Sequence, residues 1–315
     1  MPKLVENFQT ALQEHTAGSP VAEEIVWTDL TATDLAAHLT AAGTPVSVHI
    51  VEQLLAEHDY HRRKAQKTLP LDEHKDRDAQ FQNIARLKAE YLDAGHPILS
   101  IDTKKRELLG SFYRAGKLFT KETLQTFDHD FPSYAEGVVI PHGLYDLRLN
   151  QGYVHLGTSH DTSAFACDCL EDWWWRFGQQ QYPAAWSLLL LCDGGGSNSA
   201  NTYLFKADVQ ALVNKIGVAV RVAHYPPYTS KYNPIEHRLF CHLTRACQGV
   251  LFSSVAVVKQ LMEKARTRTG LRVVVAVLDK VYETGRKVAE AVKQGLRFLR
   301  DDLLPKWNYR LLPQA

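Results

Sequence analysis

The sequence predicts an α/β fold, in which a sheet with parallel strands is flanked by helices, preceded by a small all-α region that contains a helix-turn-helix. From residue 97 onward, apolar strand-like runs alternate with amphipathic helical patterns. This alternation is typical of a sheet with parallel members. Before residue 96, the recognisable patterns are short amphipathic helices separated by turns. This change of pattern near residue 96 divides the chain into two regions.

Bulk composition restricts the class of protein. The chain has 315 residues, of which 45% are hydrophobic and 23% charged, so it can bury a substantial core. Its net charge is +1, so binding to nucleic acid has to come from local basic patches. The five cysteines form no C-x-x-C pair, which fits reduced, buried thiols. With no apolar run of transmembrane length and no signal peptide, we expect a cytoplasmic protein that does not enter membranes.

Residues 31–58 have the spacing of a helix-turn-helix. TATDLAAHLTAAG predicts a helix that is capped at Thr31 or Thr33 and ends at Gly43, and a second helix begins near Ser47. The second would be the recognition helix. Any small helical domain gives the same pattern, so this motif alone leaves DNA contact open. The exposed face of the second helix would include Ser47, His49, Glu52 and Gln53.

A basic run follows the second helix. HRRKAQK, at residues 61–67, offers Arg62, Arg63 and Lys64 to DNA phosphates, although it also fits a solvated linker. We therefore divide the chain into a helical DNA-binding region at 1–67, a linker and connecting helix at 68–95, and an α/β domain at 96–315.

The α/β region contains strands and helices in a readable order. Two strand-like runs flank the polar DTKK in PILSIDTKKRELLGSFY, and more strand candidates lie in VVIPHGLYDLRLNQGYVHLGTS. A helix at 162–181 contains three consecutive tryptophans, which we expect to pack rather than to stack on bases. Strand SLLLLCD, a helix that ends at Gly217, and strand VAVRVAHY come next. The tail predicts a helix at 253–270, a strand at 271–279, a basic helix around 280–300 and a terminal WNYRLLP segment.

Three carboxylates stand out by their position. Asp102 ends the first strand of this region, Asp193 ends a later buried strand, and Glu236 begins a helix after the next strand. Each has an ordinary explanation: Asp102 and Asp193 fit turns, and the three glycines after Asp193 fit a tight turn. Functional sites gather at the carboxyl ends of strands in open α/β sheets, and adjacent parallel strands would bring Asp102 and Asp193 together. Jointly, the three favour a site.

Glu236 lies in HYPPYTSKYNPIEHRLF, at 224–240. Asn233 has the place of an N-cap, Pro234 that of the first helical residue, and Glu236 that of the third. Glu236 can thus close a capping box with Asn233 or bind a metal. With Asp102 and Asp193 at strand ends, we favour the metal carboxylate. Oxygen ligands of this kind suit Mg²⁺ or Mn²⁺, and two such ions about 3.5–4 Å apart can catalyse phosphodiester chemistry.

The motifs SIDTKKRELLG, CDGGGSN and HYPPYTSKYNPIEHRLF, with HDFPSYAEGVVIPHGLYDLRLNQGYVHLGTSHDT at 129–162 and the closing WNYRLLP, resemble the DDE transposases of the ISAzo-thirteen insertion-sequence family. The resemblance runs from about residue 26 to the C-terminus. It implies a ribonuclease-H-like mixed sheet flanked by helices, and a catalytic triad of Asp102, Asp193 and Glu236 that binds two Mg²⁺ or Mn²⁺ ions. Ser159 departs from the pattern, in which an acidic residue precedes the His160-Asp161 pair.

The resemblance also implies an activity and partners. We expect cleavage and strand transfer at transposon ends, on double-stranded DNA with terminal inverted repeats, by a homo-oligomer in a bacterial cytoplasm. The family carries more helical sequence ahead of residue 26, so this chain is expected to be a short form. A ribonuclease-H-like nuclease without strand transfer, and a non-catalytic DNA-binding protein, are the alternatives.

Further side chains near the three carboxylates are candidates for DNA contact. Lys104 and Lys105 follow Asp102, and equally fit a solvated hairpin turn. Asp161 fits an accessory acid, or better an N-cap. The remaining candidates lie around Glu236: Ser230, Lys231, Asn233 and Arg238.

Overall fold

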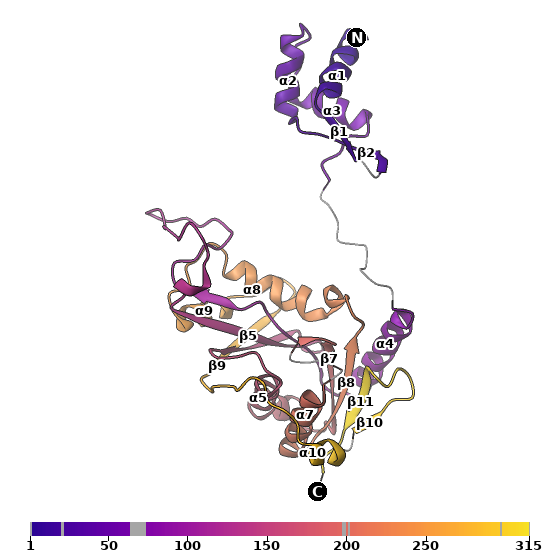
Figure 1. The fold of residues 1–315 in the computed structure, drawn as a ribbon, viewed down its shortest axis with the longest axis vertical. Coiled ribbons are helices and arrows are strands. Elements are labelled where there is room, and N and C mark those ends of the chain that lie inside the picture. The colour runs from indigo at the N-terminus through magenta and orange to yellow at the C-terminus, as the bar shows by residue number, and fades with distance from the viewer. Residues whose placement is uncertain are drawn as a thin grey trace. The chain divides into compact units, whose positions relative to one another are not determined.

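A computed structural model describes residues 2–19, 22–63, 74–196, 200, 202–296 and 298–314 (Figure 1). The chain divides into two compact units, Met1–Leu69 and Pro70–Ala315. Within the described ranges, no helix is both long enough and apolar enough to span a membrane.

In its described residues, the N-terminal unit contains three helices and a short hairpin. Its core is formed by Phe8, Leu35, Leu39 and Val51 with their neighbours. The hairpin was not predicted: Thr16–Ser19 pairs antiparallel with Ala22–Thr28, so the unit is not purely helical. The elements are α1 (Pro2–Glu14), β1 (Thr16–Ser19), β2 (Ala22–Thr28), α2 (Ala32–Ala41) and α3 (Val48–Glu57).

The predicted helix pair is confirmed in α2 and α3. Thr31 and Asp34 form a capping box at the start of α2, and the Ser47 side chain accepts a hydrogen bond from the Ile50 amide at the start of α3. Gly43, with φ of 80°, makes the turn after α2 in a left-handed conformation that suits glycine. The side chains predicted to form the outer face of α3 are exposed: Ser47, His49, Glu52 and Gln53.

The second unit is built on a mixed sheet. In the described residues this sheet has nine strands, in the order β10-β11-β8-β7-β3-β5-β6-β9, with β4 paired to β5. β3, β5 and β6 form an antiparallel set, whereas β7 and β8 run parallel to β3. The bounds are β3 (Ile98–Thr103), β4 (Glu107–Leu109), β5 (Gly137–Asp146), β6 (Gln151–Gly157), β7 (Ser187–Asp193), β8 (Ala219–Tyr225), β9 (Arg272–Leu278), β10 (Phe298–Arg300) and β11 (Asn308–Leu311).

Helices cover both faces of this sheet (Figure 1). One face packs against α5 and α7 through Phe165, Trp173 and Phe205, and the other packs against α4 and the 234–246 helix through Leu87 and Leu239. The predicted α/β fold with helices flanking a mixed sheet is therefore confirmed. The helices are α4 (Arg77–Asp93), α5 (Ser163–Trp173), α6 (Gln179–Gln181), α7 (Tyr203–Ile216), α8 (Cys241–Ala246), α9 (Val255–Glu263) and α10 (Glu290–Gly295), with short 3₁₀ turns at Pro132–Tyr134 and Ser230–Tyr232 and π-helical segments at Trp174–Gly178 and Glu236–Phe240.

One region of this unit differs from the expectation, and the tryptophan run agrees with it. The basic helix predicted around 280–300 is wrong over most of its length, because only Glu290–Gly295 is helical. Tyr282 is buried, its amide donates to Ser159 Oγ and its hydroxyl donates to Asp168 Oδ2, which holds an irregular segment against the domain. The tryptophan run behaves as predicted: Trp173 and Trp174 are buried and Trp175 is exposed.

Candidate active site

Asp102 and Asp193 lie side by side at the ends of two adjacent parallel strands. In the β3–β7 pairing, Ile98 faces Leu189 and Ser100 faces Leu191. Two residues further along both strands, the same register brings Asp102 opposite Asp193. The apolar runs that precede them keep these strands in the sheet interior, which fixes the positions of both carboxylates.

Alternation along the strands directs both carboxylates to one face of the sheet. Leu189 and Leu191 pack in the cluster on the α4 side, so Asp193, two residues further, points to that side. Ile98 belongs to the same cluster, and by the same alternation Asp102 points there too. The 234–246 helix also covers this face, and Ile235 is tied to β3 through its amide, which donates to Ser100 Oγ at 3.0 Å.

Glu236 is the first residue of a π-helical segment in that helix, and it is half-buried. A π-helical turn is uncommon and is frequently found at functional sites. The negative charge of Glu236 acts on both Asp102 and Asp193, raising the pKa of each carboxyl. The three predicted residues are thus brought into one electrostatic group.

The predicted N-cap role of Asn233 is wrong for its side chain. Asn233 is fully buried and reaches into the sheet, where its Oδ1 accepts a hydrogen bond from Ser100 Oγ. Its Nδ2 donates to the Ile101 carbonyl and to Asp193 Oδ1, both at 3.4 Å. Ser100 Oγ accepts from the Ile235 amide, so a strand residue satisfies the start of the helix. No capping box forms between Asn233 and Glu236.

Gly143 allows the Glu236 helix to lie close to the sheet. This residue faces Asp102 in the β3–β5 pairing. A Cβ atom at position 143 would lie 2.6 Å from Phe240 Cε1 and 2.9 Å from Ile235 Cδ1, so a larger residue would push the helix outward. The sequence contains this glycine, but nothing in its strand pattern indicates that it sets the distance between Glu236 and Asp102.

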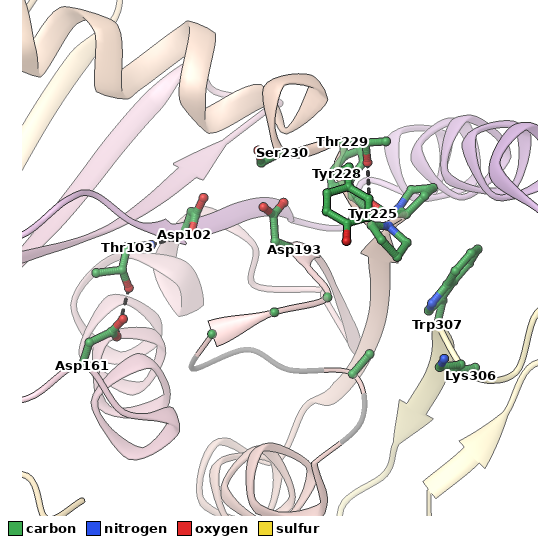
Figure 2. Close-up of a pocket in the computed structure, with 16 residues that line it drawn as sticks. Asp102, Thr103, Asp161, Asp193, Tyr225, Tyr228, Thr229, Ser230, Lys306 and Trp307 are labelled. Atoms are coloured by element: carbon green, nitrogen blue, oxygen red, sulfur yellow. Dashed lines mark hydrogen bonds between the residues drawn. The ribbon is translucent and has the colours of Figure 1, made fainter. Parts of the chain in front are cut away.

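The two aspartates open onto a cavity of about 600 Å³ (Figure 2). Thr103 and Asp161 lie at one side of it, and the Tyr225–Ser230 loop, Lys306 and Trp307 lie at the other. Thr103 Oγ1 donates to Asp161 Oδ1 at 3.1 Å, and the Thr103 amide donates to Asp102 Oδ1 at 2.7 Å. The N-cap of α5 is Thr162, so the preferred interpretation of Asp161 as a cap is wrong.

Burial and mutual repulsion hold both aspartates away from their ordinary ionisation. Burial raises the pKa of the Asp102 carboxyl to about 7, and the negative charge of Asp193 adds to the rise. Burial and Glu236 raise the pKa of Asp193 to about 6, against the hydrogen bond from Asn233, which lowers it. A bound cation would stabilise the ionised forms of these carboxylates, because it offsets their mutual repulsion.

The chemistry of the donor set fits Mg²⁺ or Mn²⁺. The charged neighbours that raise the pKa of Asp102 are Asp193, Glu236 and Asp161, and all offer hard oxygen ligands. As the side chains stand, no group of three or more His, Cys, Asp or Glu residues within the described ranges is arranged to hold a metal ion. Asp102 and Asp193 line the cavity, so they are the pair best placed to receive one.

Comparison with family models decides the class of the protein. The model described as the Rhodopirellula transposase DDE domain matches residues 7–313. The chain belongs to this family. The match begins near the N-terminus, well before residue 26, and covers both units of the transposase. The mixed sheet flanked by helices and preceded by N-terminal helices, which the resemblance implied, is the fold of this chain.

The solved structures that match this chain include transposase complexes. Two of them are entitled "Mos1 transposase paired-end complex with left transposon end" and "Crystal structure of the Mos1 Strand Transfer Complex"; they are 17% and 16% identical to this chain, with TM-scores of 0.46 and 0.45. The first match covers 82% of this chain and 70% of the other, and the second covers 82% and 69%. Among curated proteins, none matches the transposase.

The residues predicted to contact DNA lie in two environments. Lys104 is half-buried and its ammonium donates to Glu107 Oε1 at 2.6 Å, so part of its charge is already neutralised. Lys64 lies outside the described residues. The other candidates outside the triad and Asn233 are exposed: Arg62, Arg63, Lys105, Ser230, Lys231 and Arg238. Asn233 is buried, and its polar atoms bind the protein itself.

Proposed function

We propose that this transposase cleaves DNA at transposon ends in a metal-dependent reaction and joins the released 3′ ends to target DNA. One observation carries the proposal: Asp102 and Asp193 end adjacent parallel strands, point to the face covered by the Glu236 helix, and open onto a cavity. A carboxylate group on rigid elements with an open side is what phosphodiester chemistry requires.

The residues divide the work by position. Asp102 and Asp193 would share the metal ions, and Glu236 would complete one of the two sites. The ions supply activation of the nucleophile and stabilisation of the leaving oxygen. Asn233 holds Asp193 through its amide, and Gly143 allows Glu236 to approach. Water attacks the scissile phosphorus and the 3′-oxygen leaves; the 3′-hydroxyl so formed is the nucleophile of strand transfer.

The partner is double-stranded DNA with terminal inverted repeats. The region 1–67 would read these repeats through α3 and contact phosphates through Arg62, Arg63 and Lys64, and the domain from residue 96 would perform the chemistry. α4, in the 68–95 connection, packs on the sheet and so belongs structurally with that domain. Joining two ends requires two active sites, for which we propose a homo-oligomer on DNA, acting in the cytoplasm.

Substitution of Asp193 tests the proposal. Asp193→Asn should abolish Mg²⁺- or Mn²⁺-dependent nicking of a duplex that carries the inverted repeats bracketing the gene. It should not lower the unfolding temperature, and it should leave DNA binding largely intact, because the amide has the size of the carboxylate. Asp279→Asn, at an exposed residue after β9, is the matched control and should nick like wild type. Undiminished nicking by Asp193→Asn would contradict the assignment of Asp193 as a catalytic metal ligand.

Two further measurements separate the alternatives. A joining assay with pre-cleaved ends should yield strand-transfer products; hydrolysis without joining would indicate a nuclease. Titration with Mn²⁺ should give two binding events in the wild type and fewer in Asp193→Asn. A protein that binds DNA but no Mn²⁺ at this site would be a non-catalytic DNA-binding protein.

A further inference from the structure

The side of the cavity away from Asp161 is formed by an aromatic loop and a cation. Pro226, Pro227, Tyr228 and Ser230 line the cavity from the loop after β8, and Lys306 lines it from the segment before β11. Figure 2 shows Asp193 between this group and Asp102. The aromatic loop and the proposed catalytic carboxylates therefore face a common space.

Tyr228 is held outward at a conformational cost. Its side chain is 64% exposed, and its φ of 60° lies in the left-handed region that aromatic residues rarely adopt. Strain of this kind persists only where the surrounding structure imposes it, and it concentrates at ligand-binding sites. A tyrosine that only filled space would not need this backbone conformation.

The neighbouring residues impose this conformation. Thr229 is buried, and its hydroxyl donates to the Pro226 carbonyl at 2.5 Å, which closes the loop around Tyr228. The Tyr232 amide donates to the Thr229 carbonyl at 2.8 Å, and this bond closes the 3₁₀ turn that follows the loop. Two prolines before Tyr228 restrict the loop further. The ring is thus presented on a rigid support.

We propose that Tyr228 is a stacking platform for one unpaired nucleobase of the DNA strand next to the scissile phosphate, and that Lys306 contacts the phosphate beside that base. The proposal rests on the proposed function, because it takes DNA as the occupant of the cavity. An exposed flat ring on a rigid loop stacks on any base, and a nearby cation tracks the backbone. Trp307 is buried against His74 and forms part of the support instead of a second platform.

This assignment specifies the form of the substrate. A base inside a duplex has both faces covered, so a base on Tyr228 must leave its stack. Unstacking one base frees the backbone at that position to enter the cavity that holds Asp102 and Asp193. The transposase would therefore act on a DNA end that is locally opened at the cleavage position.

A double-mutant cycle between protein and DNA tests the stacking. Tyr228→Gly removes the ring and suits the left-handed backbone, so the variant should keep or raise the unfolding temperature. On intact duplex in EDTA, it should bind roughly tenfold more weakly than the wild type. On a duplex with an abasic residue at the stacked position, the two proteins should bind equally, because the ring has nothing to contact. The abasic residue is placed in turn at each position that flanks the scissile phosphate.

Matched variants define the outcome. Tyr228→Phe keeps the ring and should bind like the wild type, and Tyr113→Gly, at a residue that is 63% exposed outside the cavity, should show no dependence on any abasic position. Lys306→Gln should lower the salt dependence of binding and leave the coupling between ring and base intact. Equal losses by Tyr228→Gly on intact and abasic DNA at every position, or no loss at all, would overturn the inference.

Metal-dependent nicking by the wild type is measured separately. If the wild type nicks DNA but shows no coupling between ring and base, only the stacking proposal for Tyr228 is contradicted. If it shows coupling but no nicking, the proposed activity is contradicted, and Tyr228 remains part of a DNA-binding cavity.

Discussion

The side-chain amide of Asn233 donates a hydrogen bond to Asp193 Oδ1 over 3.4 Å, from a position that is fully buried. The same side chain accepts from Ser100 on the neighbouring strand, so it connects β3, β7 and the helix that carries Glu236. Since all three segments carry one proposed metal ligand, Asn233 fixes the relative positions of the three carboxylates. Buried polar groups with satisfied hydrogen bonds act in this way to specify one arrangement.

Replacement of Asn233 by alanine should weaken metal binding more than its effect on folding explains. The change leaves the Ser100 hydroxyl proton without its acceptor and removes the hydrogen bond to the Ile101 carbonyl, which costs about 1–3 kcal/mol of unfolding free energy. It also releases Asp193, so Mn²⁺ affinity measured by calorimetry should fall.

The matched control is Asn150→Ala. Asn150 accepts from the Tyr145 hydroxyl and donates to the Thr269 carbonyl, away from the carboxylates. Chemical denaturation should show a loss of stability in this variant as well, with unchanged Mn²⁺ affinity. Equal Mn²⁺ affinity in the two variants would argue against the positioning role of Asn233.

Substitution of Gly143 by alanine should reduce both stability and nicking. The added methyl group meets Phe240 and Ile235, and overpacking of this kind costs about 1–3 kcal/mol. Because Phe240 and Ile235 are themselves buried, we expect the clash to displace the helix from β5 and so to move Glu236 away from Asp102. We expect a fall in nicking rate of at least about tenfold, because displacement of about 1 Å at a catalytic group is enough for such losses.

Gly157→Ala provides the comparison for this experiment. Its methyl group would lie 2.8 Å from Phe165 on α5, so it strains the opposite face of the sheet. Denaturation midpoints and single-turnover nicking are measured for both variants. If Gly157→Ala loses as much activity as Gly143→Ala at similar stability, then the close approach of the Glu236 helix is not what Gly143 provides.

Much of the α/β domain could be predicted because its strands are continuous apolar runs. Runs such as SLLLLCD leave few alternatives, so the ends of β3 and β7, and with them Asp102 and Asp193, follow from the local sequence. The helices before and after β7 favour parallel strands around it. The places of the two aspartates at strand ends therefore follow from short stretches of chain, and the parallel pairing of β3 with β7 brings them together.

The features that were not predicted depend on contacts between distant segments. Asn233 has every local sign of an N-cap. Ser100, 133 residues away in the chain, accepts the hydrogen bond from the Ile235 amide in its place, and the Ser100 hydroxyl donates to the Asn233 side chain. The β1–β2 hairpin arises from pairing between two segments of a region where the local pattern indicates only helices and turns. Most of the helix expected at 280–300 does not form, because hydrogen bonds from Tyr282 to Asp168 and Ser159 hold this segment against the domain. Tertiary partners outweigh propensity in each case.

The metal-free transposase should lose stability as the pH rises from about 4 to about 7. The folded state raises the pKa of Asp102 to about 7 and that of Asp193 to about 6, whereas both are near 3.9 in an unfolded chain. A carboxyl whose pKa is raised by folding favours the folded state only while it is protonated, so its contribution is present below pH 4 and disappears as pH rises through the folded pKa. Thermal unfolding in EDTA measures this trend.

Two variations check the origin of this pH dependence. Asp102→Asn removes the group with the larger shift, so its unfolding temperature should vary less with pH and exceed that of the wild type at pH 7. Excess Mn²⁺ should raise the unfolding temperature of the wild type at pH 7, because a ligand that binds only the folded state stabilises it. A wild-type curve that is flat between pH 4 and 7 would contradict the raised pKa values that burial and mutual repulsion give the two carboxyls.

Neutralisation of Arg62 and Arg63 should weaken DNA binding without changing its sequence preference. Both side chains are exposed in the segment that follows α3. Each phosphate contact contributes about 0.9 to the slope of log affinity against log salt, so Arg62→Gln with Arg63→Gln should lower that slope by about 2. Fluorescence anisotropy from low to physiological salt gives the slope for repeat-containing and unrelated duplexes. Arg268→Gln, at an exposed arginine after α9, should leave the slope unchanged. A slope unaffected by the double substitution would assign the 61–67 segment to a solvated linker.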